Sequence, residues 1–210
     1  SWPGVSSGQE EHKMGLHGSS TTPVLLQDVM VPADAVLGEV GKGHKVAFNV
    51  LNFGRFKLGA MTAGGARRTI ADAAKYAASR RQFGVAIATF GAIRHKLGEM
   101  TAREYALESL LYRTAGLIDE TIAAGGGTAA ATLAALEEFA VEASIAKVYG
   151  SEVVDYIIDE CVQIHGGNGF VEDGPMARLY REAPLNSVWE GTANMMCMDV
   201  RRAMLKDASC

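Results

Sequence analysis

Three long segments carry apolar residues at the spacing of an α-helix, and this periodicity is the strongest constraint on the fold. They run from Gly43 to about Ser79, from about Phe90 to Ile122, and from Thr128 to Gln163. A shorter helix is expected from about Ala193 to Leu205. Because the connections are short, neighbouring helices should run antiparallel and bury their apolar faces against one another. The sequence therefore predicts a mainly α fold, an antiparallel four-helix bundle with a short β appendage at the N-terminus.

Glycine and proline mark where these helices begin and end. Arg80–Gly84 separates the first helix from the second, and Ala123–Gly127 is a flexible linker. Thr128 is a suitable N-cap for the third helix. Gly174-Pro175 opens a further short helix, and Pro184 ends that region. Some glycines inside the first helix weaken it unless another element packs close to them: Gly54, Gly59, Gly64 and Gly65.

The first 36 residues differ from the rest because they are rich in turn-forming residues. Pro23–Pro32 is a short apolar run bounded by prolines, which indicates a strand, whereas Ser6-Ser7-Gly8 indicates a turn. Two or three strands do not make an independent domain. We therefore expect residues 1–36 to be the remnant of a β-domain and residues 37–210 to form a helical-bundle domain. The start at Ser1, without an initiator methionine, suggests a fragment of a longer polypeptide.

Composition excludes several classes of protein. The chain has 210 residues, of which 48% are hydrophobic and 21% charged, and it has no run of about 18 apolar residues that would predict a membrane span. The net charge of −4 counts against a nucleic-acid-binding surface. Cys161, Cys197 and Cys210 have neither metal-ligand spacing nor the even count of a disulfide framework, so no metal site is expected. They indicate reduced thiols of an intracellular protein, in the cytoplasm or, in a eukaryote, the mitochondrial matrix.

Two blocks near the C-terminus concentrate the residues with chemical potential. Gln163–Gly169 contains three glycines within four residues, and glycine lets backbone amides approach a bulky anionic ligand. Farther on, Glu190 stands between Trp189 and Gly191 in an expected turn. A carboxylate pressed against an aromatic side chain loses water and becomes a stronger base.

Each of these signals also has an ordinary structural explanation. Glu190 could be an N-cap or first-turn residue that stabilises the dipole of the last helix, which on sequence alone is the commoner outcome. The Gly166–Gly169 stretch could be a helix C-cap followed by a turn. Arg80 and Gln82 could form a solvated helix end, and Arg55 could be a surface ion-pair partner. Taken singly, none of these signals assigns a function.

In combination and in this order, three motifs resemble the C-terminal half of the acyl-CoA dehydrogenase family. The motifs are Arg80-Arg-Gln-Phe-Gly84, Gln163-Ile-His-Gly-Gly-Asn-Gly169 and Trp189-Glu-Gly-Thr192, and the likeness runs from about Ser1 to Leu205. The resemblance implies FAD-dependent α,β-dehydrogenation of fatty acyl-CoA thioesters, a step of fatty acid β-oxidation. It also implies that residues 1–36 are the end of the family's middle β-domain.

The resemblance implies roles around the substrate. Glu190 would be the catalytic base that removes the pro-R α-proton while the β-hydride passes to flavin N5. The backbone N–H of the base and a flavin ribityl hydroxyl would polarise the thioester carbonyl. Gly191 would line the thioester, and Asn52 and Arg55 would lie close to the CoA portion or the base. In the branch typified by isovaleryl-CoA dehydrogenase the base stands at the position of Gly54, so Glu190 is the candidate here.

The resemblance also implies three groups of FAD contacts. Residues expected to contact the FAD of a neighbouring subunit are Arg80, Gln82 and Phe83. Residues expected against the adenosine and pyrophosphate across a dimer interface are Gln163, Gly166 and Gly167. Residues expected to contact the FAD of their own subunit are Thr192 and Asn194. The implied partners are an acyl-CoA, an electron-transfer flavoprotein and further copies of the chain in a homodimer or homotetramer.

Different segments resemble different branches of the family. Asn52–Phe56 resembles the very-long-chain members, whereas Arg178–Gly191 resembles the branch of the bacterial alkylation-response flavoprotein. Two alternatives therefore stay open: an alkylation-response-type flavoprotein associated with DNA, and a non-catalytic helical oligomerisation module. If the 210 residues are the whole polypeptide, we expect weak FAD binding and little turnover.

Overall fold

A computed structural model describes residues 2–207 of the chain. The chain divides into two compact units, Ser1–Phe48 and Asn49–Cys210. The boundary between them falls inside the first long helix, α1 (Gly43–Ser79).

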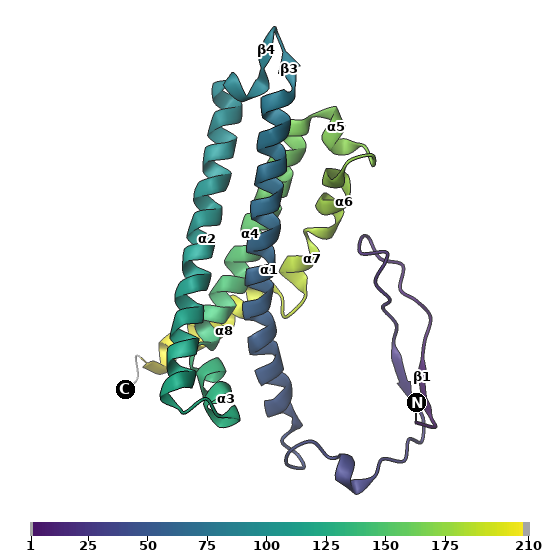
Figure 1. Cartoon of the computed structure of the whole chain (residues 1–210). Coiled ribbons are helices and arrows are strands. Elements are labelled where there is room, and N and C mark those ends of the chain that lie inside the picture. Colours follow the sequence, from purple (N-terminus) through teal and green to yellow (C-terminus); the bar gives the residue numbers. More distant parts are fainter. Residues whose placement is uncertain (1, 208–210) are drawn as a thin grey trace. The chain divides into compact units, whose positions relative to one another are not determined.

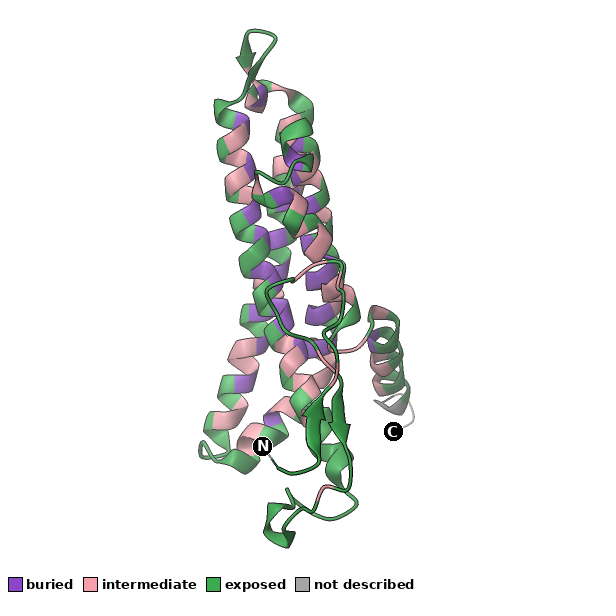
Figure 2. Cartoon of the chain, turned by 90° about the vertical axis from the view of Figure 1, so that its right-hand side faces the viewer, coloured by how far each residue is buried: buried purple, intermediate pink, exposed green. Residues whose placement is uncertain are grey.

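The first unit contains a small antiparallel hairpin. Strand β1 (Val5–Ser7) pairs with β2 (Val24–Leu26), with Ser6 opposite Leu25. The expected strand within Pro23–Pro32 is thus confirmed only in its first residues. The expectation of a turn at Ser6-Ser7 is wrong, because pairing with β2 outweighs their weak strand preference. Both strands are exposed along their whole length (Figure 2), so this hairpin buries no core of its own. A single 3₁₀ turn, η1 (Ala33–Ala35), follows.

The second unit is a helical bundle, so the predicted mainly α fold is confirmed. Its long members are α1, α2 (Gly91–Ala124) and α4 (Ala140–His165), which run side by side in Figure 1. Helix α8 (Ala193–Asp207) packs against α4, as does α6 (Pro175–Glu182). The buried residues follow the inward faces of the long helices (Figure 2).

The third predicted helix is in fact two. Helix α3 (Ala129–Glu138) ends at Phe139, whose φ of −94° and ψ of 24° leave the helical range, and α4 begins at the next residue. The predicted N-cap is confirmed, because the Thr128 hydroxyl accepts a hydrogen bond from Ala131 N at 3.1 Å. The break lets α3 pack against α2, and no glycine or proline at Phe139 announces it.

Glycine brings α1 and α4 into close contact. A Cβ on Gly150 would lie 2.4 Å from Thr62 Oγ1 and 3.3 Å from Gly59 Cα. An element therefore packs close to Gly59. At Gly64 and Gly65 a Cβ would meet nothing within 4 Å, so these two glycines weaken the helix without a packing contact.

Short elements stand between the longer helices along the chain. The Arg80–Gly84 break forms a hairpin of β3 (Arg81–Gln82) and β4 (Val85–Ala86), with Phe83 and Gly84 at φ of 52° and 83°. The remaining elements are η2 (Ile87–Thr89), α5 (Gly167–Phe170) and α7 (Leu185–Val188). Within residues 2–207, the helices are too short or too polar to cross a membrane. The same residues hold no group of three or more His, Cys, Asp or Glu side chains suited to a metal ion.

Candidate functional site

Glu190 lies in the turn between α7 and α8, with the left-handed φ of 55°, and Gly191 follows at 97°. A left-handed conformation is unfavourable for glutamate and persists only when surrounding contacts enforce it. Helix α8 begins at Ala193 and has no acidic residue in its first turn. The structural explanation of Glu190 as a first-turn residue is therefore wrong, whereas its expected place in a turn is confirmed.

The side chain of Glu190 reaches helix α1 at Gly54. A Cβ built on Gly54 would lie 2.4 Å from Glu190 Oε2 and 2.7 Å from Cδ. The carboxylate therefore occupies space that is free only because residue 54 has no side chain. Glu190 is half-buried, and the preceding Trp189 is 37% exposed.

Arg55 holds the main chain of this turn. Its Nε donates to Glu190 O at 3.3 Å, while Nη1 donates to Asn52 Oδ1 at 3.3 Å and to Ser144 Oγ at 3.5 Å. Its Nη2 lies 3.7 Å from Asp199 Oδ2. Arg55 is only 9% exposed, so the alternative of a surface ion-pair residue is wrong. Arg55 thus connects α1, α4 and α8 to the turn that carries the Glu190 carboxylate.

Sequence reasoning missed Lys147 on α4, which is 0% exposed. Its Nζ donates to Ser187 O at 3.0 Å, three residues before Glu190. Burial lowers the pKa of Lys147, the Arg55 guanidinium lowers it further, and the Glu190 carboxylate acts against both. The sequence did hold a signal, because Lys147 follows Ala143 and Ala146 on the apolar stripe of α4.

Four predicted site residues thus meet at one place: Asn52, Arg55, Glu190 and Gly191. Two further predicted residues, Thr192 and Asn194, lie exposed where α8 begins.

Five other predicted residues surround a second place, a cavity of about 380 Å³. Its predicted lining residues are Arg80, Gln82, Gln163, Gly166 and Gly167. Two motifs far apart in sequence therefore form one recess, of the size usual for ligand pockets. Phe83 does not line it; this ring is 91% exposed at the hairpin and meets Phe90 edge-on at 6.1 Å.

The floor of this cavity is tied together by Tyr76. Its ring stacks on His165 at 4.2 Å, and its hydroxyl donates to His165 O at 3.3 Å and accepts from Asn168 Nδ2 at 2.9 Å. Gly166 caps α4, with φ of 59° and its N–H directed to Val162 O at 2.9 Å. The C-cap explanation of this glycine is therefore also correct. A Cβ on Gly166 or Gly167 would meet nothing within 4 Å, so their backbone edge is open to a ligand.

The two places do not coincide within one chain. Figure 1 shows α5 near the β3–β4 hairpin, at one end of the bundle, whereas α7 and α8 lie farther along it. The predicted site residues thus form two separate groups.

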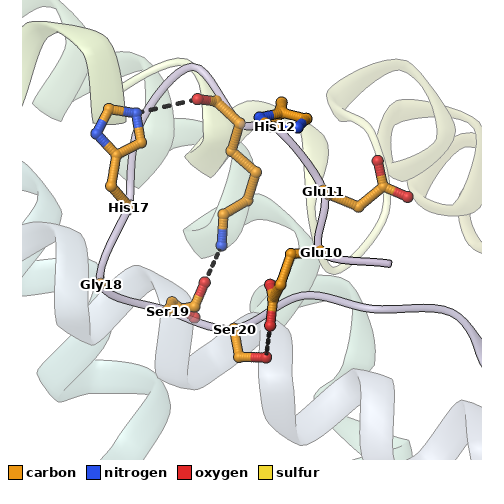
Figure 3. A pocket seen from close by; sticks show the side chains of 8 residues that line it. Glu10, Glu11, His12, His17, Gly18, Ser19 and Ser20 are labelled. Carbon is orange, nitrogen blue, oxygen red and sulfur yellow. Dashed lines mark hydrogen bonds between the residues drawn. The ribbon is translucent and has the colours of Figure 1, made fainter. Parts of the chain in front are cut away.

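A third recess, of about 550 Å³, lies in the first unit (Figure 3) and is lined by Glu10–Lys13 and His17–Ser20. Its polar groups satisfy one another: Lys13 Nζ donates to Ser19 O and to Thr21 Oγ1, and Ser20 donates to Glu10. The bond from Ser20 is the main cause of the lowered pKa of Glu10. No predicted site residue lies there.

Comparisons with known proteins agree over nearly the whole chain. Residues 41–205 match the family model described as acyl-CoA dehydrogenase, C-terminal domain. A probable acyl-CoA dehydrogenase of Bacillus subtilis is 45% identical over 214 residues, which cover 99% of this chain and 36% of that protein. The mitochondrial very long-chain specific acyl-CoA dehydrogenase of Rattus norvegicus is 38% identical over 207 residues, 95% of this chain and 30% of that protein.

The fold is likewise that of a solved structure. The crystal structure of an acyl-CoA dehydrogenase complexed with FAD from Bacillus anthracis superposes with a TM-score of 0.95 at 44% identity, over 99% of this chain and 36% of that chain. The chain thus spans about a third of the length of the proteins that it matches.

Proposed function

Because the chain belongs to the acyl-CoA dehydrogenase family, we propose that it contributes the proton-abstracting base to FAD-dependent α,β-dehydrogenation of fatty acyl-CoA thioesters. The observation that carries the proposal is the position of the Glu190 carboxylate over the bare Gly54. The main chain of Glu190 is held by Arg55, and its carboxylate fills the space beside α1 that Gly54 leaves free.

Glu190 would take the α-proton of the thioester. This proton is a weak acid, so the base needs a fixed position and the thioester carbonyl needs a hydrogen-bond donor. Within residues 2–205, the Glu190 N–H has no acceptor in hydrogen-bond range, which leaves it available to that carbonyl. One residue would thus supply both the base and a donor to the developing enolate.

The cavity near α5 would hold part of FAD. It combines an open glycine edge, a stacked aromatic floor and the polar side chains of Arg80, Gln82 and Gln163. These groups would hold the adenosine and pyrophosphate, and Thr192 and Asn194 would contact a flavin beside Glu190. FAD, when bound, accepts the β-hydrogen as hydride, so that loss of the α-proton leaves a Cα=Cβ double bond.

We expect a homodimer or homotetramer, because the α5 cavity and the Glu190 turn lie at different places along the bundle. One FAD reaching both the α5 cavity and a Glu190 site would have to bridge two copies of the chain. An electron-transfer flavoprotein would then reoxidise the flavin, and the substrate would be a fatty acyl-CoA. The rat relative, a very long-chain specific enzyme, makes long acyl chains the first to test.

Anaerobic titration tests the proposal. The purified chain is saturated with FAD and mixed with acyl-CoAs of graded length while flavin absorbance is followed. We expect slow bleaching in the wild-type chain, because the chain spans about a third of the length of its relatives, and none in Glu190→Gln, which removes the base with little change of shape. If the chain binds FAD and no acyl-CoA bleaches it, the proposal is wrong for this chain.

A further inference from the structure

Lys147 is an unusual residue to find inside this bundle. It lies on α4, is 0% exposed, and lysine is rarely buried completely unless it is paired. Within residues 2–205, no carboxylate oxygen lies within 4.0 Å of its Nζ. Its hydrogen-bond acceptor is instead a main-chain carbonyl, Ser187 O, at 3.0 Å.

The segment that accepts this bond is not stable by itself in its observed conformation. Helix α7 is a single turn of four residues, too short to be stable alone. Glu190 and Gly191 follow in left-handed conformations, with φ of 55° and 97°. The turn therefore depends on bonds from outside, which come from Lys147 to Ser187 O and from Arg55 to Glu190 O. These two cationic side chains donate hydrogen bonds to main-chain carbonyls on either side of Trp189.

We propose that Lys147 is a positioning residue for Glu190: its ammonium fastens the Ser187 carbonyl to α4 and so keeps the Glu190 carboxylate over Gly54. The proposal deepens the function argued above and rests on Glu190 as the base. Lys147 touches neither substrate nor flavin in this account, and it acts through the turn.

Charge adds to this mechanical role. The charged groups that face the turn are Lys147 from α4, Arg55 from α1 and Asp199 from α8, together with Glu190 itself. The Glu190 carboxylate favours the charged form of Lys147, which acts against the effects of burial and Arg55 on the Lys147 pKa. Burial and Arg55 lower the pKa of Lys147 below its ordinary 10.5. The hydrogen bond from Lys147 to Ser187 O should therefore weaken at a pH below the one at which a solvated lysine loses its proton.

Trp189 offers a direct readout that needs neither FAD nor substrate. The chain has two tryptophans, so Trp2→Phe leaves Trp189 as the sole tryptophan. In that background we compare Lys147→Met, Lys147→Arg and, as a control on an exposed lysine of α1, Lys75→Met. Acrylamide quenching of Trp189 and hydrogen exchange of residues 187–191 are measured on the full chain.

In Lys147→Met we expect acrylamide to quench Trp189 more readily. The amides of residues 187–191 should exchange on the order of tenfold faster, because a hydrogen bond from a charged donor is lost. Lys147→Arg should restore part of the protection, and Lys75→Met should change neither quantity. If Lys147 only filled space, Lys147→Met should leave quenching and exchange unchanged or reduced, because replacing a buried charge by an apolar side chain is often neutral or stabilising. Unchanged quenching and exchange in Lys147→Met would overturn the proposal.

A pH titration keeps the proposal testable if Lys147→Met does not fold. In Trp2→Phe alone, Trp189 emission should titrate with a midpoint below 10.5, and this step should vanish in Lys147→Arg because arginine keeps its proton. A titration that is absent from the parent, or identical in both chains, would overturn the proposal.

Activity then separates this proposal from the function on which it rests. In the FAD-loaded chain, Lys147→Met should slow anaerobic bleaching and should change kcat more than KM. Glu190→Gln should abolish bleaching while Lys147 still protects the turn. If Glu190→Gln bleaches normally, the proposed function is wrong. The positioning role of Lys147 is tested separately, by the Trp189 measurements.

Discussion

Glu190 Oε2 lies 2.4 Å from the point that a Cβ on Gly54 would occupy. Two residues far apart in sequence thus share one small volume, which a side chain from only one of them can fill. This geometry would let a carboxylate reach the same volume from either position. A carboxylate that starts from position 54 of α1 would project into the space that Glu190 fills from the turn. In this chain the Glu190 carboxylate can occupy this position only because residue 54 is glycine.

The first prediction follows from that contact. Gly54→Ala should displace the Glu190 carboxylate and slow anaerobic flavin bleaching by on the order of 100-fold, the effect of misplacing a reacting group by about 1 Å. The matched control is Gly64→Ala on the same helix, where a Cβ meets nothing within 4 Å. This control should bleach normally and gain up to about 1 kcal/mol of stability, because alanine is the better helix former. Equal bleaching rates in Gly54→Ala and wild type would contradict the assignment of Glu190.

Most of the fold follows from the sequence because apolar periodicity is a property of each helix. Helix α1 begins and ends where expected, and the Thr128 cap is where side-chain chemistry placed it. The break at Phe139 was missed because it depends on how α3 meets α2, which no local residue encodes. The hairpin at Arg81–Ala86 was likewise interpreted only as an interruption, since two-residue strands have no periodicity to detect.

The site was predictable where a motif was distinctive and not where a residue type is usually solvated. The family resemblance singled out Glu190 and Arg55, and the structure joins them through one hydrogen bond at 3.3 Å. Lys147 went unnoticed because a lysine on a helix normally faces water, although here it is fully buried. Asp199 could not be foreseen either, because its role beside Arg55 depends on how α8 folds back.

The second prediction concerns the contact between α1 and α4. Gly150→Ala places a Cβ 2.4 Å from Thr62 Oγ1, so one helix must shift, and we expect a loss of about 1–3 kcal/mol in the free energy of unfolding. Gly116→Ala on α2 is the control, because a Cβ there meets nothing within 4 Å. Urea unfolding followed by circular dichroism measures both. A Gly150→Ala chain as stable as Gly116→Ala would mean that the two helices are packed less tightly than described.

The third prediction concerns the pH dependence of stability. Glu104 on α2 is buried, and within residues 2–205 its Oε1 has no hydrogen-bond partner. Burial first, and then the neighbouring Glu108, raise the pKa of Glu104 above its ordinary 4.5, while Arg67 from α1 lowers it. The folded chain therefore binds this proton more tightly than the unfolded chain does. Stability from this group is present below pH 4.5 and declines as the pH rises through the folded-state pKa.

Glu104→Gln should remove that decline. We expect its melting temperature to fall less than that of the wild type between pH 4.5 and pH 8, with the two chains closest at the acid end. Glu120→Gln, at an exposed position of the same helix, serves as the control and should follow the wild-type curve. Parallel melting curves for wild type and Glu104→Gln would show that Glu104 keeps its ordinary ionisation in the folded chain.

The last prediction tests the cavity near α5 as a cofactor site. The Tyr76 hydroxyl joins His165 O and Asn168 Nδ2, and its ring stacks on His165 at 4.2 Å. Tyr76→Phe keeps the stacked ring and removes both hydrogen bonds, which should loosen the glycine turn at Gly166 by about 1 kcal/mol. Since one RT ln 10 is about 1.4 kcal/mol, FAD affinity should fall by roughly fivefold. Flavin fluorescence titration measures that change, with Tyr112→Phe, an exposed tyrosine of α2, as the control. If Tyr76→Phe and Tyr112→Phe bind FAD equally well, the adenosine portion does not lie in this cavity.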